Sequence, residues 1–311
     1  MRLAVVGAGG VGGYFGGRLA QAGESVVFIA RGAHLEAIRR DGLRVESIAG
    51  DFLIRPAETT ADPEAAGAVE AVLVCVKAWQ VTEAARTLRP LLGPDTFVVP
   101  LQNGVEAAGE LSAVIGPERV LGGLCKIVSY IVGPGHIRHA GAVPRVEFGE
   151  RDGERTARVA ALRAAFERCA GVSVDTPRDI EAATWEKFLF IAPFGGVAAV
   201  TRMPAGVVRT VPETRDLLQR AMREVLELAR ARGVELAAGA VERTLAYVDD
   251  LPEDATASMQ RDIMEGRPSE LDYQTGAIVR LAREVRVEVP TNAFIYASLL
   301  PSERRARHRV P

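Results

Sequence analysis

Residues 2–31 read RLAVVGAGGVGGYFGGRLAQAGESVVFIAR, and this stretch decides the fold. Leu3–Val6 is an uncharged apolar run, which is typical of a strand buried on both faces of a parallel sheet. We expect a helix from about Val11 to Ala22 that stops at Gly23, because glycine readily follows the last turn of a helix. Ser25–Ala30 is a second apolar run. The stretch therefore predicts a strand, a helix and a parallel strand.

The glycines between the first strand and the helix fit the pattern G-x-G-x-x-G. Gly7 allows a tight turn, Gly9 lets the backbone approach a pyrophosphate, and Gly12 lets the helix pack closely on the strand. The unpaired N–H groups of the helix start favour an anion. A purely structural glycine turn is the alternative. We predict a dinucleotide site whose turn comprises Gly7, Ala8, Gly9, Gly10, Val11 and Gly12.

Arg31 ends the second strand and indicates which dinucleotide binds. An NAD site usually has Asp or Glu there to bind the ribose 2′-hydroxyl, whereas a guanidinium suits a 2′-phosphate. A solvated surface arginine is the alternative interpretation. The sequence therefore predicts NADP(H) as the cofactor.

Composition narrows the class of protein. The chain has 311 residues, which favours two domains, and 48% hydrophobic with 25% charged residues is ordinary for a globular protein. A net charge of −2 gives no indication of a nucleic-acid partner. We expect the arginine-rich residues 304–309 to form a frayed, solvated tail. Composition and charge therefore give no reason to expect a polyanionic partner.

The cysteines and the apolar runs indicate the cellular compartment of the protein. Cys75, Cys125 and Cys169 are odd in number and widely spaced, so we expect buried free thiols and no disulfide or metal site. The N-terminal residues do not resemble a signal peptide. The longest apolar run, Phe188–Val200, is too short to span a membrane, and Pro193 is expected to break it. These features predict a cytoplasmic protein without membrane attachment.

The pattern after Arg31 continues the alternation of strand and helix. We expect buried strands at Ala71–Val76 and Thr96–Leu101, weaker strands at the sheet edge within 43–57, and two or three strands within 120–150 that extend the sheet. Strands and helices alternating at this spacing describe an α/β, Rossmann-type doubly wound parallel sheet. Ligands bind beyond the carboxyl ends of such strands, where Lys77, Gln80 and Asn103 follow.

Beyond residue 176 the pattern is helical. Thr176 and Pro177 suit the cap and first position of a helix, and Pro212–Arg232 has one continuous apolar face. We therefore predict an NADP-binding domain over 1–177 and an all-α substrate and catalytic domain over 178–311.

Three polar residues of the second domain are candidates for chemistry. Lys187 begins the most apolar stretch of that domain, and a partly desolvated ammonium there can protonate a carbonyl oxygen. A lysine that extends its charge to the surface is the alternative. Glu270 and Ser258 lie near predicted helix starts, where caps or solvated side chains are the simpler interpretation.

Together these segments resemble the ketopantoate reductase (2-dehydropantoate 2-reductase) family over nearly the whole chain. The matching pieces are the glycine turn, Arg31, Lys77-Ala78-Trp79-Gln80, Leu101-Gln102-Asn103-Gly104, Trp185-Glu186-Lys187, Ser258-Met259-Gln260 with Asp262, and Glu270-Leu271-Asp272-Tyr273. The resemblance implies that Arg31 holds the 2′-phosphate, that Lys77, Gln80 and Asn103 contact the cofactor, that Lys187 is the general acid, and that Asn103, Lys187, Ser258 and Glu270 contact substrate. Asn103 and Glu270 would join Lys187 as catalytic residues. The helical domain would resemble the C-terminal domain of 6-phosphogluconate dehydrogenase relatives.

Two positions depart from the family pattern, which has asparagines four and eight residues after the lysine. Here those positions are Ile191 and Gly195, so we expect a more apolar pocket and leave the substrate open. The resemblance implies NADPH-dependent reduction of a 2-oxo acid to a 2-hydroxy acid, with ketopantoate to pantoate in pantothenate biosynthesis as the leading reaction. A reductase of a different branched 2-oxo acid and a non-catalytic NADP(H)-binding sensor are the alternatives. The oligomeric state is open, with a homodimer among the options.

Overall fold

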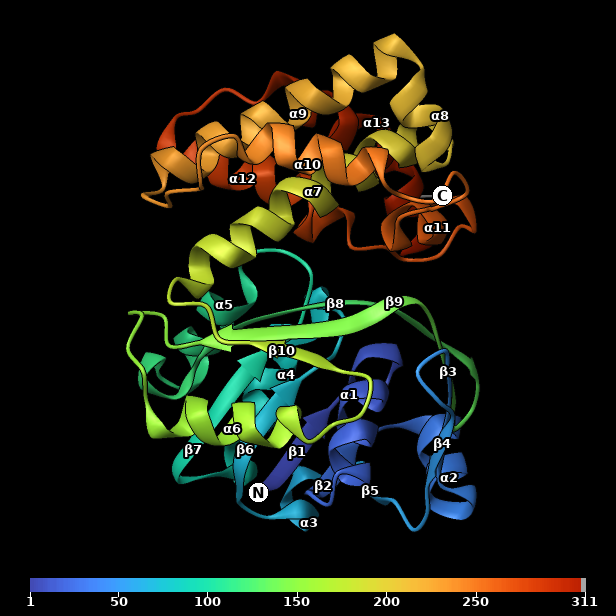
Figure 1. Cartoon of the computed structure of the whole chain (residues 1–311), viewed down its shortest axis with the longest axis vertical. Helices are drawn as coiled ribbons and strands as arrows, with labels where there is room; N and C mark the ends of the chain where they lie inside the picture. Colours follow the sequence, from blue (N-terminus) through green and yellow to red (C-terminus); the bar gives the residue numbers. More distant parts are fainter. Residues whose placement is uncertain (309–311) are drawn as a thin grey trace. The chain divides into compact units, whose positions relative to one another are not determined.

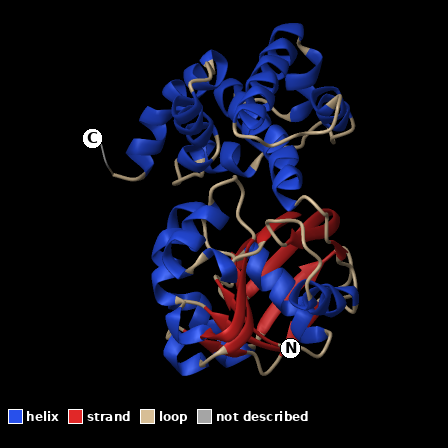
Figure 2. Ribbon diagram, turned by 90° about the vertical axis from the view of Figure 1, so that its left-hand side faces the viewer, coloured by secondary structure: helices blue, strands red, loops and turns tan. Residues whose placement is uncertain are grey.

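The computed structural model describes residues 1–308, and the chain divides into two compact units. The first unit comprises residues 1–102 and 107–180, and the second comprises residues 103–106 and 181 onward. Within the described residues all strands belong to the first unit, and the second is built from helices (Figure 2). The predicted pairing of an α/β fold with an all-α fold is confirmed.

The first unit is organised around a five-stranded parallel sheet with the order β5-β2-β1-β6-β7 (Figure 1). All four pairings in this sheet are parallel. Side chains of β1 alternate between two cores, with Leu3 and Val5 on one face and Ala4 and Val6 on the other. The sheet is therefore buried on both faces, as its uncharged runs predict. The strands are β1 Arg2–Val6, β2 Ser25–Ile29, β5 Glu58–Thr60, β6 Val69–Val74 and β7 Leu92–Pro100.

Helices cover both faces of the parallel sheet. Residues of α4 and α5 share a core with Val72 and Val74, whereas residues of α1 and α6 share the opposite core with Leu73. The elements are α1 Gly10–Gln21, α2 Gly32–Asp41, α3 Pro63–Ala66, α4 Val81–Thr87, α5 Ala107–Ile115 and α6 Ala157–Glu167, with short 3₁₀ turns η1 Ala78–Gln80, η2 Arg89–Leu91 and η3 Pro117–Arg119.

A second sheet in this unit corrects the expectation for residues 43–57 and 120–150. Strands from both segments form it, with β10-β9-β3-β4 in order and β8 paired to β9, so they do not extend the parallel sheet. The reason is the tight turn at 134–135, which joins antiparallel neighbours, whereas a parallel addition needs a longer crossover. The strands are β3 Leu43–Ser47, β4 Phe52–Ile54, β8 Gly122–Gly133, β9 His136–Gly149 and β10 Ser173–Asp175.

Helix α1 packs closely on both sheets because two neighbouring glycines on its surface, Gly13 and Gly16, each face one of them. A Cβ added to Gly16 would lie 2.7 Å from the Phe28 ring of the parallel sheet. A Cβ added to Gly13 would lie 1.9 Å from Ile137 of the second sheet. No side chain fits at either position, so the backbone of α1 fills the space between the sheets.

The second unit contains the remaining helices around one core. Of the apolar face predicted for Pro212–Arg232, the central residues Leu218, Ala221, Met222, Val225 and Ala229 are buried. No helix within residues 1–308 is both long and apolar enough to cross a membrane. The helices are α7 Ile180–Thr201, α8 Ala205–Thr210, α9 Pro212–Ala231, α10 Ala240–Asp249, α11 Ser258–Met264, α12 Thr275–Val285 and α13 Pro290–Ala306, with the turn η4 Leu271–Tyr273.

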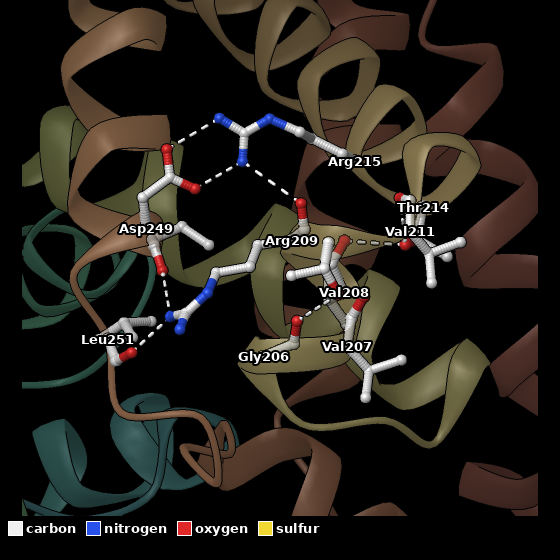
Figure 3. Close-up of polar contacts among 11 residues, drawn as sticks. Gly206, Val207, Val208, Arg209, Val211, Thr214, Arg215, Asp249 and Leu251 are labelled. Carbon is white, nitrogen blue, oxygen red and sulfur yellow. Dashed lines mark hydrogen bonds and ion pairs between the residues drawn. The ribbon is translucent and has the colours of Figure 1, made fainter.

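Two arginines join α8 and α9 to the end of α10 (Figure 3). The guanidinium of Arg215 donates to both carboxylate oxygens of Asp249, at 2.5 and 2.8 Å. Arg209 donates to the carbonyl oxygen of Val248 at 3.3 Å and to that of Leu251. Cations at a helix C-terminus satisfy its unpaired carbonyls, so these contacts fix the end of α10.

Three local expectations from the sequence were wrong. Helix α7 begins at Ile180, four residues after the predicted cap Thr176, whose hydroxyl accepts a bond from Arg163 at 3.1 Å. Pro193 lies inside α7 without ending it, since the buried side chains around it stabilise the helix. Helix α13 extends through Ala306 and Arg307 is bonded to Glu303, so residues 304–307 are not a frayed tail. Arg309 lies outside the described residues.

The cysteines are free thiols, as predicted. Cys125 and Cys169 are buried, and Cys75 is partly buried at the end of β6. Burial raises the pKa of the Cys169 thiol to about 12. These thiols are structural side chains of the core.

Candidate active site

The glycine turn joins β1 to α1, and its glycines have different roles. Gly7 has a φ of +99°, which favours glycine. A Cβ on Gly12 would lie 2.1 Å from the Gly7 carbonyl oxygen, so this position belongs to the packing of the turn. A Cβ on Gly9 would meet no atom within 4 Å. Gly9 therefore borders the open space that a phosphate needs in order to approach the backbone, and the residues present fit a dinucleotide.

His34 of α2 holds the glycine turn in place, although no sequence motif marks it. The backbone N–H of Gly135 donates to His34 Nδ1 at 3.0 Å, which makes Nδ1 the acceptor. The proton of the neutral ring is then on Nε2, and it donates to the Ala8 carbonyl oxygen at 2.8 Å. The imidazole thus links the turn to the β8–β9 connection.

The ends of the parallel strands bring the other predicted cofactor residues to one edge of the sheet. The Gly7 N–H bonds to Ile29 O at 3.0 Å and the Cys75 N–H to Val6 O at 2.8 Å, so β1, β2 and β6 end side by side. Arg31 follows β2 and its side chain is 70% exposed, 3.6 Å from the exposed carboxylate of Glu83. An exposed pair of this kind is weak, so the guanidinium is available to an anion.

Lys77 and Gln80 follow β6 at the same edge. Both are exposed, and the Lys77 ammonium lies 5.7 Å from the centre of the Trp79 ring. The backbone N–H of Lys77 donates to Gln80 Oε1 at 3.3 Å, which orders the short turn η1.

In the second unit the structure joins Asn103 and Glu270, which are far apart in the sequence. The Asn103 amide Nδ2 donates to Glu270 Oε2 at 3.1 Å, and Glu270 is only 6% exposed. A buried carboxylate is stabilised by donors of this kind. The pair combines an amide and a carboxylate that were both predicted as substrate contacts.

The segment that carries Asn103 is fixed to the helical unit. Glu106 accepts two bonds from Arg280 of α12, at 2.6 and 3.3 Å. Gly104 has a φ of +105°, and a Cβ there would lie 2.8 Å from the Tyr273 carbonyl oxygen. Residues 103–106 therefore pack against η4 and α12, which presents the Asn103 amide to Glu270.

Helix α13 clamps the segment that carries Glu270. Glu303, 2% exposed, accepts bonds from the backbone N–H and hydroxyl of Ser269, and Arg307 donates to the Ser269 carbonyl at 2.7 Å. The Tyr296 hydroxyl donates to Asp272 at 2.7 Å. Burial and this bond raise the pKa of Tyr296 to about 12, so the hydroxyl keeps its proton at neutral pH.

Lys187 lies half-buried on α7, between Trp185 and Phe188 in the sequence, and the rings of those two residues pack with their centres 5.6 Å apart. Gly195 lies two turns further along α7, and Cβ atoms at 195 and 257 would be 3.6 Å apart. Ala257 immediately precedes Ser258, the half-buried first residue of α11. The described residues contain no cluster of His, Cys, Asp or Glu suited to a metal ion.

Comparison with known proteins places the chain among the oxidoreductases. Residues 3–153 match the family Ketopantoate reductase PanE/ApbA, and residues 179–302 match the C-terminal domain of the same family. These matches cover both structural units. The chain therefore belongs to the ketopantoate reductase family.

Some similar proteins are named 2-dehydropantoate 2-reductases, whereas another is an uncharacterized oxidoreductase. A 2-dehydropantoate 2-reductase of Mesorhizobium japonicum is 33% identical, with 94% of each chain covered. An uncharacterized oxidoreductase of Bacillus subtilis, YkpB, is 32% identical over 96% of this chain and 98% of its own. The crystal structure of 2-dehydropantoate 2-reductase from Geobacter metallireducens superposes with a TM-score of 0.90 at 32% identity, covering 97% of this chain and 100% of that one.

The different surroundings of two glycines predict different effects of the same substitution. Gly12→Ala places a methyl group against the Gly7 carbonyl, and overpacking of this kind costs about 1–3 kcal/mol. Gly9→Ala meets no atom, so the free energy of unfolding without ligand should stay close to that of the wild type. Thermal unfolding of both variants without cofactor tests this. Equal Tm values for the two variants would contradict it.

Proposed function

We propose that this protein uses NADPH to reduce a 2-oxo acid to the 2-hydroxy acid, with 2-dehydropantoate as the first candidate substrate. The observation that carries the proposal is the buried Glu270 carboxylate bonded to the Asn103 amide, in the same unit as Lys187. A protein that only senses a dinucleotide has no need of this arrangement. In the family to which the chain belongs, these residue types at matching positions serve the reduction.

The first unit supplies the binding of the cofactor in this proposal. The turn Gly7–Gly12 receives the pyrophosphate, Arg31 binds the 2′-phosphate, and Lys77 and Gln80 make further contacts at the same sheet edge. Arginine at the position where an NAD site usually has a carboxylate favours NADPH. When bound, NADPH supplies a hydride to the carbonyl carbon of the substrate.

The second unit supplies the proton and the orientation of the substrate. Lys187 in its ammonium form donates a proton to the carbonyl oxygen as negative charge develops there. Ser258 binds the substrate carboxylate, and Glu270 with Asn103 fixes the orientation of the carbonyl group. The reaction consumes one 2-oxo acid, one NADPH and one proton, and it produces the 2-hydroxy acid and NADP⁺.

Lysine at 187 is notable because the chain uses arginine almost everywhere else. Only three of its 38 basic residues are lysines, at positions 77, 126 and 187. An ammonium can release its proton during catalysis, whereas a guanidinium cannot. The presence of lysine at this position therefore supports a role in proton transfer.

Ile191 and Gly195 favour a second candidate, a reductase of a different branched 2-oxo acid. Steady-state NADPH oxidation with ketopantoate and a panel of branched 2-oxo acids distinguishes the candidates. We expect turnover with at least one member of the panel. Tight NADPH binding without turnover of any of them would instead indicate a sensor.

The choice of cofactor can be tested at Arg31. Arg31→Ala should weaken NADPH binding roughly 10- to 150-fold, because a charge-assisted contact contributes about 1.5–3 kcal/mol, and should leave NADH binding nearly unchanged. Arg39→Ala is a matched control, since Arg39 is also exposed and paired with a glutamate, Glu36. Dissociation constants from fluorescence titration provide the measurement. Equal losses for NADPH and NADH would show that Arg31 has only a structural role.

The proton donor can be tested at Lys187. Lys187→Ala should lower kcat by roughly 10²- to 10⁴-fold while NADPH affinity stays nearly the same. In the wild type, kcat for reduction should fall as pH rises, because the ammonium form is the donor. Lys187→Arg should not restore activity, since the guanidinium holds its proton too tightly.

Lys126→Arg is the matched control for this experiment. Lys126 is exposed and pairs with Glu147 at 3.5 Å, so arginine should replace it without effect on kcat. If Lys187→Ala keeps most of its turnover, or if Lys187→Arg is as active as Lys126→Arg, Lys187 is not the acid.

A further inference from the structure

The side-chain amide of Gln274 has one atom, Nε2, that faces a hydrogen-bond partner and one, Oε1, that does not. The residue is fully buried between η4 and α12, and its backbone N–H donates to the Glu270 carbonyl at 2.9 Å. Its Nε2 faces Glu270 Oε2 at 3.5 Å. Its Oε1 has no hydrogen-bond partner among residues 1–308. A buried carbonyl oxygen without a donor is unfavourable, so this atom needs an explanation.

The orientation of the amide follows from the neighbouring carboxylate. Turning the amide by 180° would place Gln274 Oε1 against Glu270 Oε2, two acceptors facing one another. The observed orientation directs the donor to Glu270 and the acceptor away from it. Asn103, Glu270 and Gln274 thus form a row of polar groups that ends in an unused acceptor.

The unused acceptor lies beside Gly195. The three atoms nearest to a Cβ added at Gly195 would be Met259 Cε at 3.2 Å, Gln274 Oε1 at 3.4 Å and Ala257 Cβ at 3.6 Å. Oε1 is therefore the one polar atom among these three nearest neighbours. Residue 195 is one of the two positions at which the sequence departs from the family pattern, and Gln274 Oε1 is a polar group that another segment places beside it.

We propose that Gln274 Oε1 accepts a hydrogen bond from a donor on the side chain of the 2-oxo acid, which makes Gln274 a specificity-determining residue. This inference rests on the proposed function. It assigns as preferred substrates 2-oxo acids that carry a hydroxyl group on the side chain, over the same acids without it. The sequence predicts a pocket more apolar than the family pattern, and this inference adds one acceptor atom to it.

The test compares ketopantoate with 3,3-dimethyl-2-oxobutanoate, which differs only in lacking the terminal hydroxyl. The wild type should prefer ketopantoate, and Gln274→Met, of similar length but without an acceptor, should reduce the ratio of the two kcat/KM values about 10- to 100-fold. Most of the change should be a loss on ketopantoate, with NADPH affinity unaltered. Gln219→Met makes the same exchange on α9 and should leave the ratio unchanged.

A second variant reaches the same contact from α7. Gly195→Ala adds a methyl group 3.4 Å from Oε1 and should lower the ratio in the same direction, so it decides the question if Gln274→Met does not fold. An unchanged ratio in a folded variant, or an equal loss on both substrates, overturns the inference and leaves the proposed function in place. A wild type that reduces no 2-oxo acid overturns the proposed function and this inference with it.

Discussion

The close packing of α1 against two sheets is the constraint on which the first unit depends. Gly16 faces Phe28 of the parallel sheet and Gly13 faces Ile137 of the second sheet, each without space for a side chain. The same helix begins at the phosphate turn, so its position also sets the direction of the N–H groups at its start. Gly13 and Gly16, which the motif does not require, allow the helix to pack directly against both sheets.

The second unit positions its polar groups by a different means. Asn103 and Glu270 lie on short irregular segments, and these are fixed by charged contacts from long helices, Glu106 to Arg280 of α12 and Ser269 to Glu303 of α13. A buried carboxylate needs such fixed donors because its desolvation is costly. Rigid helices therefore hold Asn103 and Glu270, although both residues lie on loops.

The sequence predicted the elements that local residue patterns determine. It did not predict which strands, distant in the sequence, pair with one another. The buried parallel strands, α1 and the amphipathic α9 follow from periodicity and glycine spacing, and all were found. The second sheet was missed because apolar alternation in β8 and β9 does not reveal which strand pairs with which. The cap proposed at Thr176 was wrong because α7 begins four residues later, at Ile180, and the residue types that cap helices also occur in turns and loops.

The candidate site, like the fold, could be predicted from the sequence only in part. The positions of Gly7–Gly12, Arg31 and Asn103 could be predicted from strand ends, and their roles stay predictions until tested. The hydrogen bond from His34 to the Ala8 carbonyl could not be predicted, because a single histidine in a helix belongs to no motif. Gln274 was missed because its proposed role depends on its position next to Gly195, a residue of another helix that has no side chain. A pocket can lose a polar group on one element and regain one from another, so motif matching alone cannot specify its substrate.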